Sequence, residues 1–119
     1  MGSFRELKVW QLNQGCIKQS LNLLKELRDD FAYQHIAKQL FRAISSIGAN
    51  IAEGQDSYEG KEFIRYLSIA VRSSIECDHW LATLENLYLN LSFEKLKTSN
   101  LEVIKMLKAL RGSIEQKRT

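Results

Sequence analysis

The 119-residue sequence predicts an all-α fold, an antiparallel up-and-down four-helix bundle that forms a single domain over residues 1–119. Proline is absent, so nothing in the chain breaks long helices in the usual way. Apolar residues recur at alternating three- and four-residue spacing, the period of a bundle helix, and no segment shows the two-residue alternation of strands joined by hairpin turns. Four such helices with short connections pack most simply as an up-and-down bundle. The expected helices cover about residues 4–28, 34–54, 58–91 and 93–116.

The first two helices each carry an apolar stripe. In the first helix we predict a core stripe widened by Cys16, Leu23 and Leu27, and its main residues are Leu7, Trp10, Gln14, Ile17, Leu21 and Leu24. The second helix follows a turn at Asp29-Asp30, begins near Tyr33 or Gln34 and stops at Gly54, because glycine commonly ends helices. Its predicted core stripe comprises Ile36, Leu40, Ile44, Ile47 and Ile51.

The second helix also has an intermediate strip of mostly small side chains beside its core stripe. The strip comprises Ala37, Phe41, Gly48 and Ala52. It indicates either a tolerated part of a solvated face or a contact with another subunit, and the pattern does not decide between them.

The third helix has the most regular pattern, and Asp56 or Ser57 is suited to cap its start. Its predicted stripe comprises Phe63, Leu67, Ala70, Ser74, Cys77, Leu81, Leu84, Tyr88 and Leu91. Ser92 is a candidate cap for the last helix, and Thr98-Ser99-Asn100 is a candidate interruption of it. The stripe expected there comprises Leu96, Val103, Leu107, Leu110 and Ile114.

Positive charge is concentrated near the end of the sequence. The net charge is +3, and residues 95–119 hold seven Lys or Arg against two Glu. The candidate nucleic-acid-binding residues are Lys105, Lys108, Arg111, Lys117 and Arg118. A solvated charged face is the alternative, and without aromatic stacking platforms neither single-strand stacking nor sequence-specific readout is expected.

The reactive residue types do not form a recognisable catalytic or metal pattern. A di-iron bundle needs two Glu-x-x-His motifs, and only one is present, from Glu76 to His79. Cys16 and Cys77 are far apart in sequence and are interpreted as reduced packing residues, and the glycines form no phosphate-binding loop. We therefore expect no enzyme activity, no metal and no cofactor.

No stretch of the sequence has the length or apolarity of a membrane-targeting segment. No run reaches the roughly 20 apolar residues that cross a bilayer, and the first residues lack an apolar signal-peptide core. We expect a cytoplasmic protein without membrane contact.

Five segments of the sequence carry a recognisable pattern, namely residues 7–11, 39–43, 46–54, 62–70 and 73–76, of which Asn-Ile-Ala-Glu-Gly at 50–54 is the most specific part. In these segments the chain resembles a family of four-helix-bundle proteins encoded within intervening sequences of bacterial 23S ribosomal RNA genes. The resemblance implies a ring-like homopentamer. It also implies a fold similar to that of the accessory variability proteins of diversity-generating retroelements, which bind nucleic acid and a reverse transcriptase.

Three polar residues of the second helix match the pattern of this family. Arg42 and Glu53 project almost alike three turns apart, and Asn50 lies near them. The arrangement favours a structural polar network between helices or between subunits over a catalytic role.

Two functions remain open on this basis. The leading hypothesis is a non-enzymatic homo-oligomer, associated with RNA or DNA through its basic surface or serving as a scaffold. The alternative is a protein-interaction adaptor that docks a partner such as a reverse transcriptase without contacting nucleic acid.

Overall fold

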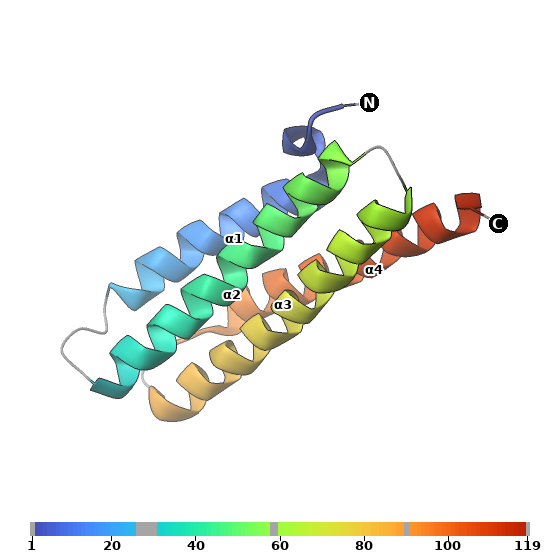
Figure 1. Ribbon diagram of the computed structural model, residues 1–119. Coiled ribbons are helices and arrows are strands. Elements are labelled where there is room, and N and C mark those ends of the chain that lie inside the picture. Colours follow the sequence, from blue (N-terminus) through green and yellow to red (C-terminus); the bar gives the residue numbers. More distant parts are fainter. Residues whose placement is uncertain (1, 26–30, 58–59, 90, 119) are drawn as a thin grey trace.

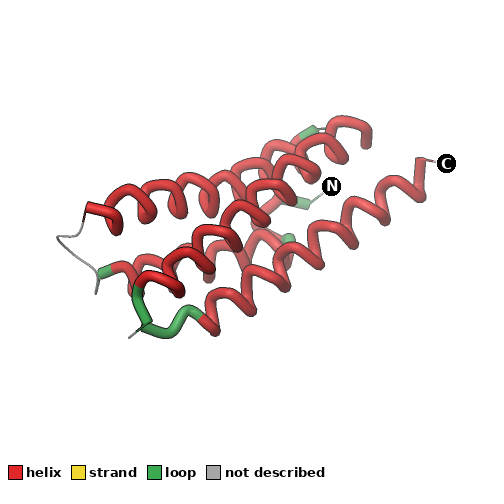
Figure 2. Tube along the Cα trace, turned by 90° about the horizontal axis from the view of Figure 1, so that it is seen from below, coloured by secondary structure: helices red, strands yellow, loops and turns green. Residues whose placement is uncertain are grey.

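The computed structural model describes residues 2–25, 31–57, 60–89 and 91–118, and in these ranges the chain is helical without any strand. The elements are the 3-10 helix η1 (Phe4–Glu6) and the helices α1 (Lys8–Leu24), α2 (Phe31–Asp56), α3 (Gly60–Leu87) and α4 (Glu94–Arg118). Each helix packs on the one before it and α4 closes against α1, in a body of 50 × 20 × 19 Å. The chain therefore forms the predicted all-α, antiparallel up-and-down bundle, with both termini at one end (Figures 1 and 2).

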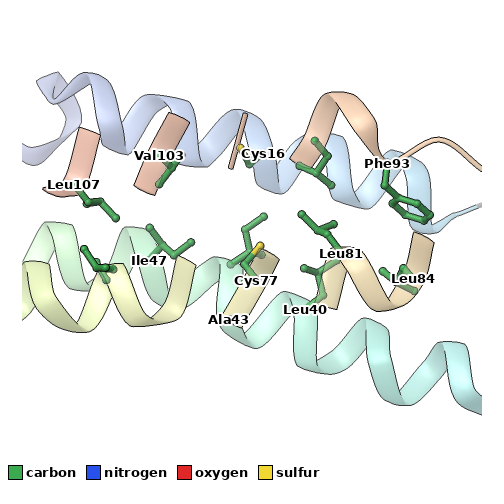
Figure 3. Close-up of a cluster of buried hydrophobic side chains, with 14 of the residues drawn as sticks. Cys16, Leu40, Ala43, Ile47, Cys77, Leu81, Leu84, Phe93, Val103 and Leu107 are labelled. Carbon is green, nitrogen blue, oxygen red and sulfur yellow. The ribbon is translucent and has the colours of Figure 1, made fainter. Parts of the chain in front are cut away.

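The core runs along the whole bundle and is filled by aliphatic side chains from all four helices (Figure 3). The predicted stripe of α2 is confirmed, since all five of its residues are buried. In α3 the stripe is buried from Leu67 to Leu84, whereas Phe63 at its start and Tyr88 and Leu91 at its end are only partly covered. Phe93, just before α4, is also fully enclosed.

The predicted core stripe of α1 is wrong by one residue over most of its length, although Leu24 and the flanking Cys16 are buried as predicted. Leu27 lies outside the described residues. The residues that α1 buries are Val9, Asn13, Cys16, Ser20 and Leu24. Gln14 and Leu21 are exposed, and Trp10 and Ile17 are half-buried. The side of α1 that faces the core includes polar residues, because Asn13 Nδ2 donates to the Ile44 carbonyl oxygen at 3.1 Å. A hydrophobicity pattern assigns a face with polar residues to solvent. The neighbouring side of α1, which is more apolar, was therefore predicted to face the core.

The intermediate strip of α2 packs against α1 at Gly48. A Cβ placed on Gly48 would lie 2.7 Å from Asn13 Oδ1 and 3.5 Å from Trp10 Nε1. Gly48 and Ala37 are buried, whereas Phe41 and Ala52 are only partly buried. The two helices approach closely at Gly48 because this residue has no side chain.

Gly54 does not end α2, which begins at Phe31 and continues to Asp56. A Cβ on Gly54 would lie 2.7 Å from Phe63 Cδ1 and 3.0 Å from Tyr66 Cβ. Close approach of α3, rather than helix termination, therefore explains this glycine. Asp56, proposed as a cap for the third helix, is instead the last residue of α2.

The remaining boundaries differ from the sequence predictions by a few residues. Residues 4–6 form a separate 3-10 turn before α1, α3 ends at Leu87 instead of 91, and α4 runs to Arg118. The predicted end of the first helix at 28 and start of the third at 58 lie outside the described residues.

Helix α4 is continuous through Thr98-Ser99-Asn100, so the predicted interruption is absent. Asn100 is fully buried, and its Nδ2 donates to the Ser74 carbonyl oxygen at 2.9 Å. A polar residue that the pattern assigned to a break is thus a buried contact between α4 and α3. None of the helices, over the residues described, is both long and apolar enough to cross a bilayer.

Candidate nucleic-acid interface

Helix α4 turns its apolar stripe toward the core and presents two lysines on its outer face. Leu96, Val103 and Leu107 are buried, while Lys105 and Lys108 are exposed. Neither lysine forms an ion pair with any residue in the described ranges. Both ammonium groups are thus available to bind an anion.

Arg111 is placed differently from these two lysines. Its Nη1 donates to Ser68 Oγ on α3 at 3.3 Å, and its Nε lies 3.9 Å from Glu115 Oε1. The guanidinium therefore bridges the seam between α3 and α4, with part of its hydrogen-bonding capacity used by the protein itself.

Lys117 and Arg118 lie in the last turn of α4 and are exposed. The aliphatic part of Arg118 packs beside the first residue of α3, since a Cβ on Gly60 would lie 3.2 Å from Arg118 Cδ. The five predicted residues thus share one helix but form three separate groups: the free lysines Lys105 and Lys108, the bridging Arg111, and the terminal pair.

Arg72 on α3 is a basic residue that sequence reasoning did not include in this surface. Two contacts, Ser68 with Arg111 and Ser74 with Asn100, fix the antiparallel register of α3 and α4. Arg72 lies between these contacts and is exposed, so it is level with the part of α4 that carries the two free lysines. Only the register reveals this proximity, because Arg72 stands alone in the sequence.

A second polar surface follows the seam between α2 and α3. Arg42 forms an ion pair with Glu76, whose Oε2 also accepts a hydrogen bond from Trp80 Nε1 at 3.0 Å. Arg42 in addition donates to Gln39 Oε1 at 3.2 Å. Side chains of α2 and α3 are therefore linked by a hydrogen-bonded cluster beside the core.

The three residues of the predicted polar network lie in different surroundings within the single chain. Arg42 pairs with Glu76 of the neighbouring helix instead of Glu53, which is exposed. Asn50 Nδ2 donates to Ser46 Oγ at 3.1 Å, and that hydroxyl lies 3.1 Å from Ser73 Oγ. Arg42 and Asn50 each take part in a link across the seam, and they belong to different clusters.

Both thiols are buried, and one imidazole packs against an aromatic ring. Burial raises the pKa of the Cys16 thiol to about 11 and raises that of Cys77 further, so both are protonated at neutral pH. His79 packs edge-on against Trp80 with ring centroids 4.6 Å apart. Within the described ranges no three His, Cys, Asp or Glu residues are grouped closely enough to hold a metal.

Residues 5–109 match the family described as 23S rRNA-intervening sequence protein. The chain belongs to this family. A crystal structure of a protein of unknown function from the S23 ribosomal protein family of Bacteroides thetaiotaomicron is 26% identical, with a TM-score of 0.76, over 87% of this chain and 97% of that one. No curated protein matches the chain.

The match to the 23S rRNA-intervening sequence family covers only part of the basic surface. Lys105 and Lys108 lie inside the matched residues 5–109, together with the α2–α3 seam. Arg111, Lys117 and Arg118 lie beyond them. The free lysines therefore belong to the part of the chain that corresponds to the family, and the terminal pair is an extension of it.

Proposed function

We propose that this member of the 23S rRNA-intervening sequence protein family is a non-enzymatic protein that binds the backbone of RNA or DNA through α4. The observation that carries the proposal is the pair of exposed lysines, Lys105 and Lys108, that no described carboxylate neutralises. Binding of lysine to phosphate releases counterions and needs no base-specific contact.

The neighbouring basic residues support a surface that follows a phosphate backbone. Arg72 flanks the lysines on α3, and Lys117 and Arg118 continue the charge to the end of α4, roughly 20 Å from Lys105 at the helical rise. Helix α4 contains no aromatic residue. Stacking on unpaired bases is therefore disfavoured, and a duplex is the better ligand.

Replacing Lys105 and Lys108 by glutamine is expected to weaken binding to a 20-base-pair RNA or DNA duplex by about tenfold at 50 mM salt. The slope of log K against log salt should also become shallower by about 1.8, because each lost phosphate contact removes about 0.9. Titration of a fluorescent duplex at about 50 and 200 mM salt measures both effects.

The matched control for this titration replaces two exposed lysines elsewhere, Lys8 and Lys38, by glutamine. It removes the same charge from α1 and α2, so it should leave the salt slope nearly unchanged. Equal losses in the two variants, or no binding by the unmodified protein at low salt, would refute a direct role for α4.

The same proposal includes self-association, with a homopentamer as the expected assembly. Its support is apolar surface exposed near one end of the single chain, where Phe31 is 91% and Leu89 85% exposed and Leu87 is half-exposed. Such surface commonly lies in subunit or partner contacts. Light scattering or native mass measurement should give about five times the 13.8 kDa chain mass, and a monomeric mass at all concentrations would exclude the ring.

The same apolar end favours one alternative, an adaptor that docks a protein such as a reverse transcriptase. An adaptor would use its charges for solubility alone, so the duplex titration distinguishes it from the leading proposal. Copurification of a partner with a protein that binds no duplex would support the adaptor.

A further inference from the structure

Helix α1 carries an apolar shoulder that the bundle core leaves partly uncovered. Trp10, Ile17 and Leu21 follow the three–four spacing of a helix seam, yet Leu21 is 47% exposed and the other two are only half-buried. Together with Gln14, Gly15 and Lys18 they line an open groove of about 450 Å³. Seam spacing on an outer face is the pattern into which another helix packs.

Gly15 lies in this groove, and no described neighbour requires a glycine there. A Cβ on Gly15 would lie more than 4 Å from every described atom that could obstruct it, whereas Gly48 and Gly54 each have a closely packed neighbour. Glycine inside a helix is unfavourable relative to alanine. The missing side chain leaves room for a second backbone to approach α1.

Positive charge predominates along α1 and the part of α2 beside it. Neither α1 nor α2 as far as Ala52 contains an aspartate or glutamate, whereas they carry Lys8, Lys18 and Lys38. Lys18 lines the groove itself, and Lys25 follows at the end of α1. Two symmetric copies of α1 would bring like charges together, so the charge favours an anionic occupant over a second α1.

We propose that this groove on α1 binds an acidic amphipathic helix of a partner protein. Apolar residues of that helix at i, i+3 or i+4, and i+7 lie on Trp10, Ile17 and Leu21, and its backbone approaches over Gly15. Its flanking carboxylates pair with Lys18 and Lys25. The proposal concerns a different surface from the α4 lysines, so each can fail without the other.

The probe is a synthetic amphipathic peptide of about 18 residues, long enough to cover the roughly 17 Å from Trp10 to Leu21. It has leucines at seam spacing and glutamates on both flanks, and a second peptide has lysine in place of every glutamate. By fluorescence anisotropy the acidic peptide should bind with a Kd of about 10–100 µM and the basic peptide at least tenfold more weakly.

Gly15→Leu should raise the Kd of the acidic peptide by at least tenfold, because the new side chain fills the groove. The same change should raise Tm by about 2–6 °C, because leucine is the better helix former and no described atom obstructs its Cβ. A merely unfolded variant cannot give this combination of weaker binding and higher Tm.

Gly112→Leu is the matched control, since a Cβ on Gly112 would also meet no obstructing described atom within 4 Å. It should raise Tm similarly and leave peptide binding unchanged. Lys18→Glu should reverse the preference between the two peptides.

Three results would overturn the proposal. The first is no binding of the acidic peptide at about 1 mM, or equal binding by the Gly15→Leu variant. The second is self-association of the unmodified protein that Gly15→Leu abolishes, which would assign the groove to a second copy. The third is binding of an RNA duplex that depends on Lys18 while the peptide does not bind, which would assign it to nucleic acid.

Discussion

Replacing Asn100 by aspartate is expected to lower the free energy of unfolding at pH 7 by about 3–5 kcal/mol. Asn100 is fully buried between α4 and α3, and its Nδ2 donates to the Ser74 carbonyl oxygen. Its Oδ1 accepts no hydrogen bond from a described residue. Aspartate would place a carboxylate oxygen against the Ser74 carbonyl oxygen and bury an unpaired charge.

The loss should depend on pH, with a sign that follows from burial. Burial raises the pKa of the introduced carboxyl above its unfolded value of about 3.9. Below that value the group is protonated in both states, and its hydroxyl can donate to the Ser74 carbonyl oxygen. As pH rises from about 4 toward the folded pKa, the unfolded state ionises first, and stability falls by about 1.4 kcal/mol per unit.

Urea denaturation of the Asn100→Asp variant and the unmodified protein at pH 4 and pH 7 measures this difference directly. Asn22→Asp is the matched control, because Asn22 is exposed on α1 and its replacement should change stability by less than about 0.5 kcal/mol. Equal destabilisation of the Asn100→Asp variant at both pH values would show that burial of the carboxylate charge is not the cause of the loss.

Asn13 and Asn100 also show why the sequence predicts the architecture better than the register. Each lies on an inner face, and each donates its amide to a carbonyl of the adjacent helix, Asn13 to Ile44 and Asn100 to Ser74. Periodicity identifies helices through their apolar residues. It therefore assigns a buried asparagine to a solvent-exposed position or to a break in the helix. The number and order of the helices could therefore be predicted, whereas the rotation of α1 and the continuity of α4 could not.

Glycine shows a related limit. Gly54 stands where a helix stop is common, but the contact that requires it comes from Phe63 and Tyr66 of α3. Local sequence rules predict helix ends from glycine because termination is a local event. Close packing of two helices depends on tertiary structure, which the neighbouring residues in sequence do not specify.

Some residues of the candidate interface could likewise be predicted from the sequence, and others could not. Lys105 and Lys108 could be found from spacing on a single helix, because their exposure depends only on which side of α4 is apolar. The position of Arg72 level with these lysines depends on the alignment of α3 with α4. The pairing of Arg42 with Glu76 depends on the alignment of α3 with α2. Charges brought together by two helices are not visible until the register is known.

The two buried thiols should make the protein unusually sensitive to alkaline pH. Burial raises the pKa of Cys16 to about 11, and that of Cys77 is raised further by burial and by the proximity of Cys16. In the unfolded chain both thiols have a pKa of about 8.5. Their contribution to stability is therefore complete below about pH 8.5 and is lost as pH rises toward the folded pKa values.

Between about pH 9 and 11 the two cysteines should together lower the free energy of unfolding by about 2.7 kcal/mol per pH unit. Urea denaturation across this range measures the slope in the unmodified protein and in a Cys16→Ala/Cys77→Ala variant. Tyrosine and lysine titrate alike in both proteins, so the difference between the slopes isolates the thiols. The variant should be less stable at pH 7, because small cavities replace the sulfur atoms, yet lose stability more slowly in alkali. Parallel slopes would mean that the thiolates reach solvent without unfolding, a result incompatible with two cysteines that are 1% and 0% exposed in the bundle core.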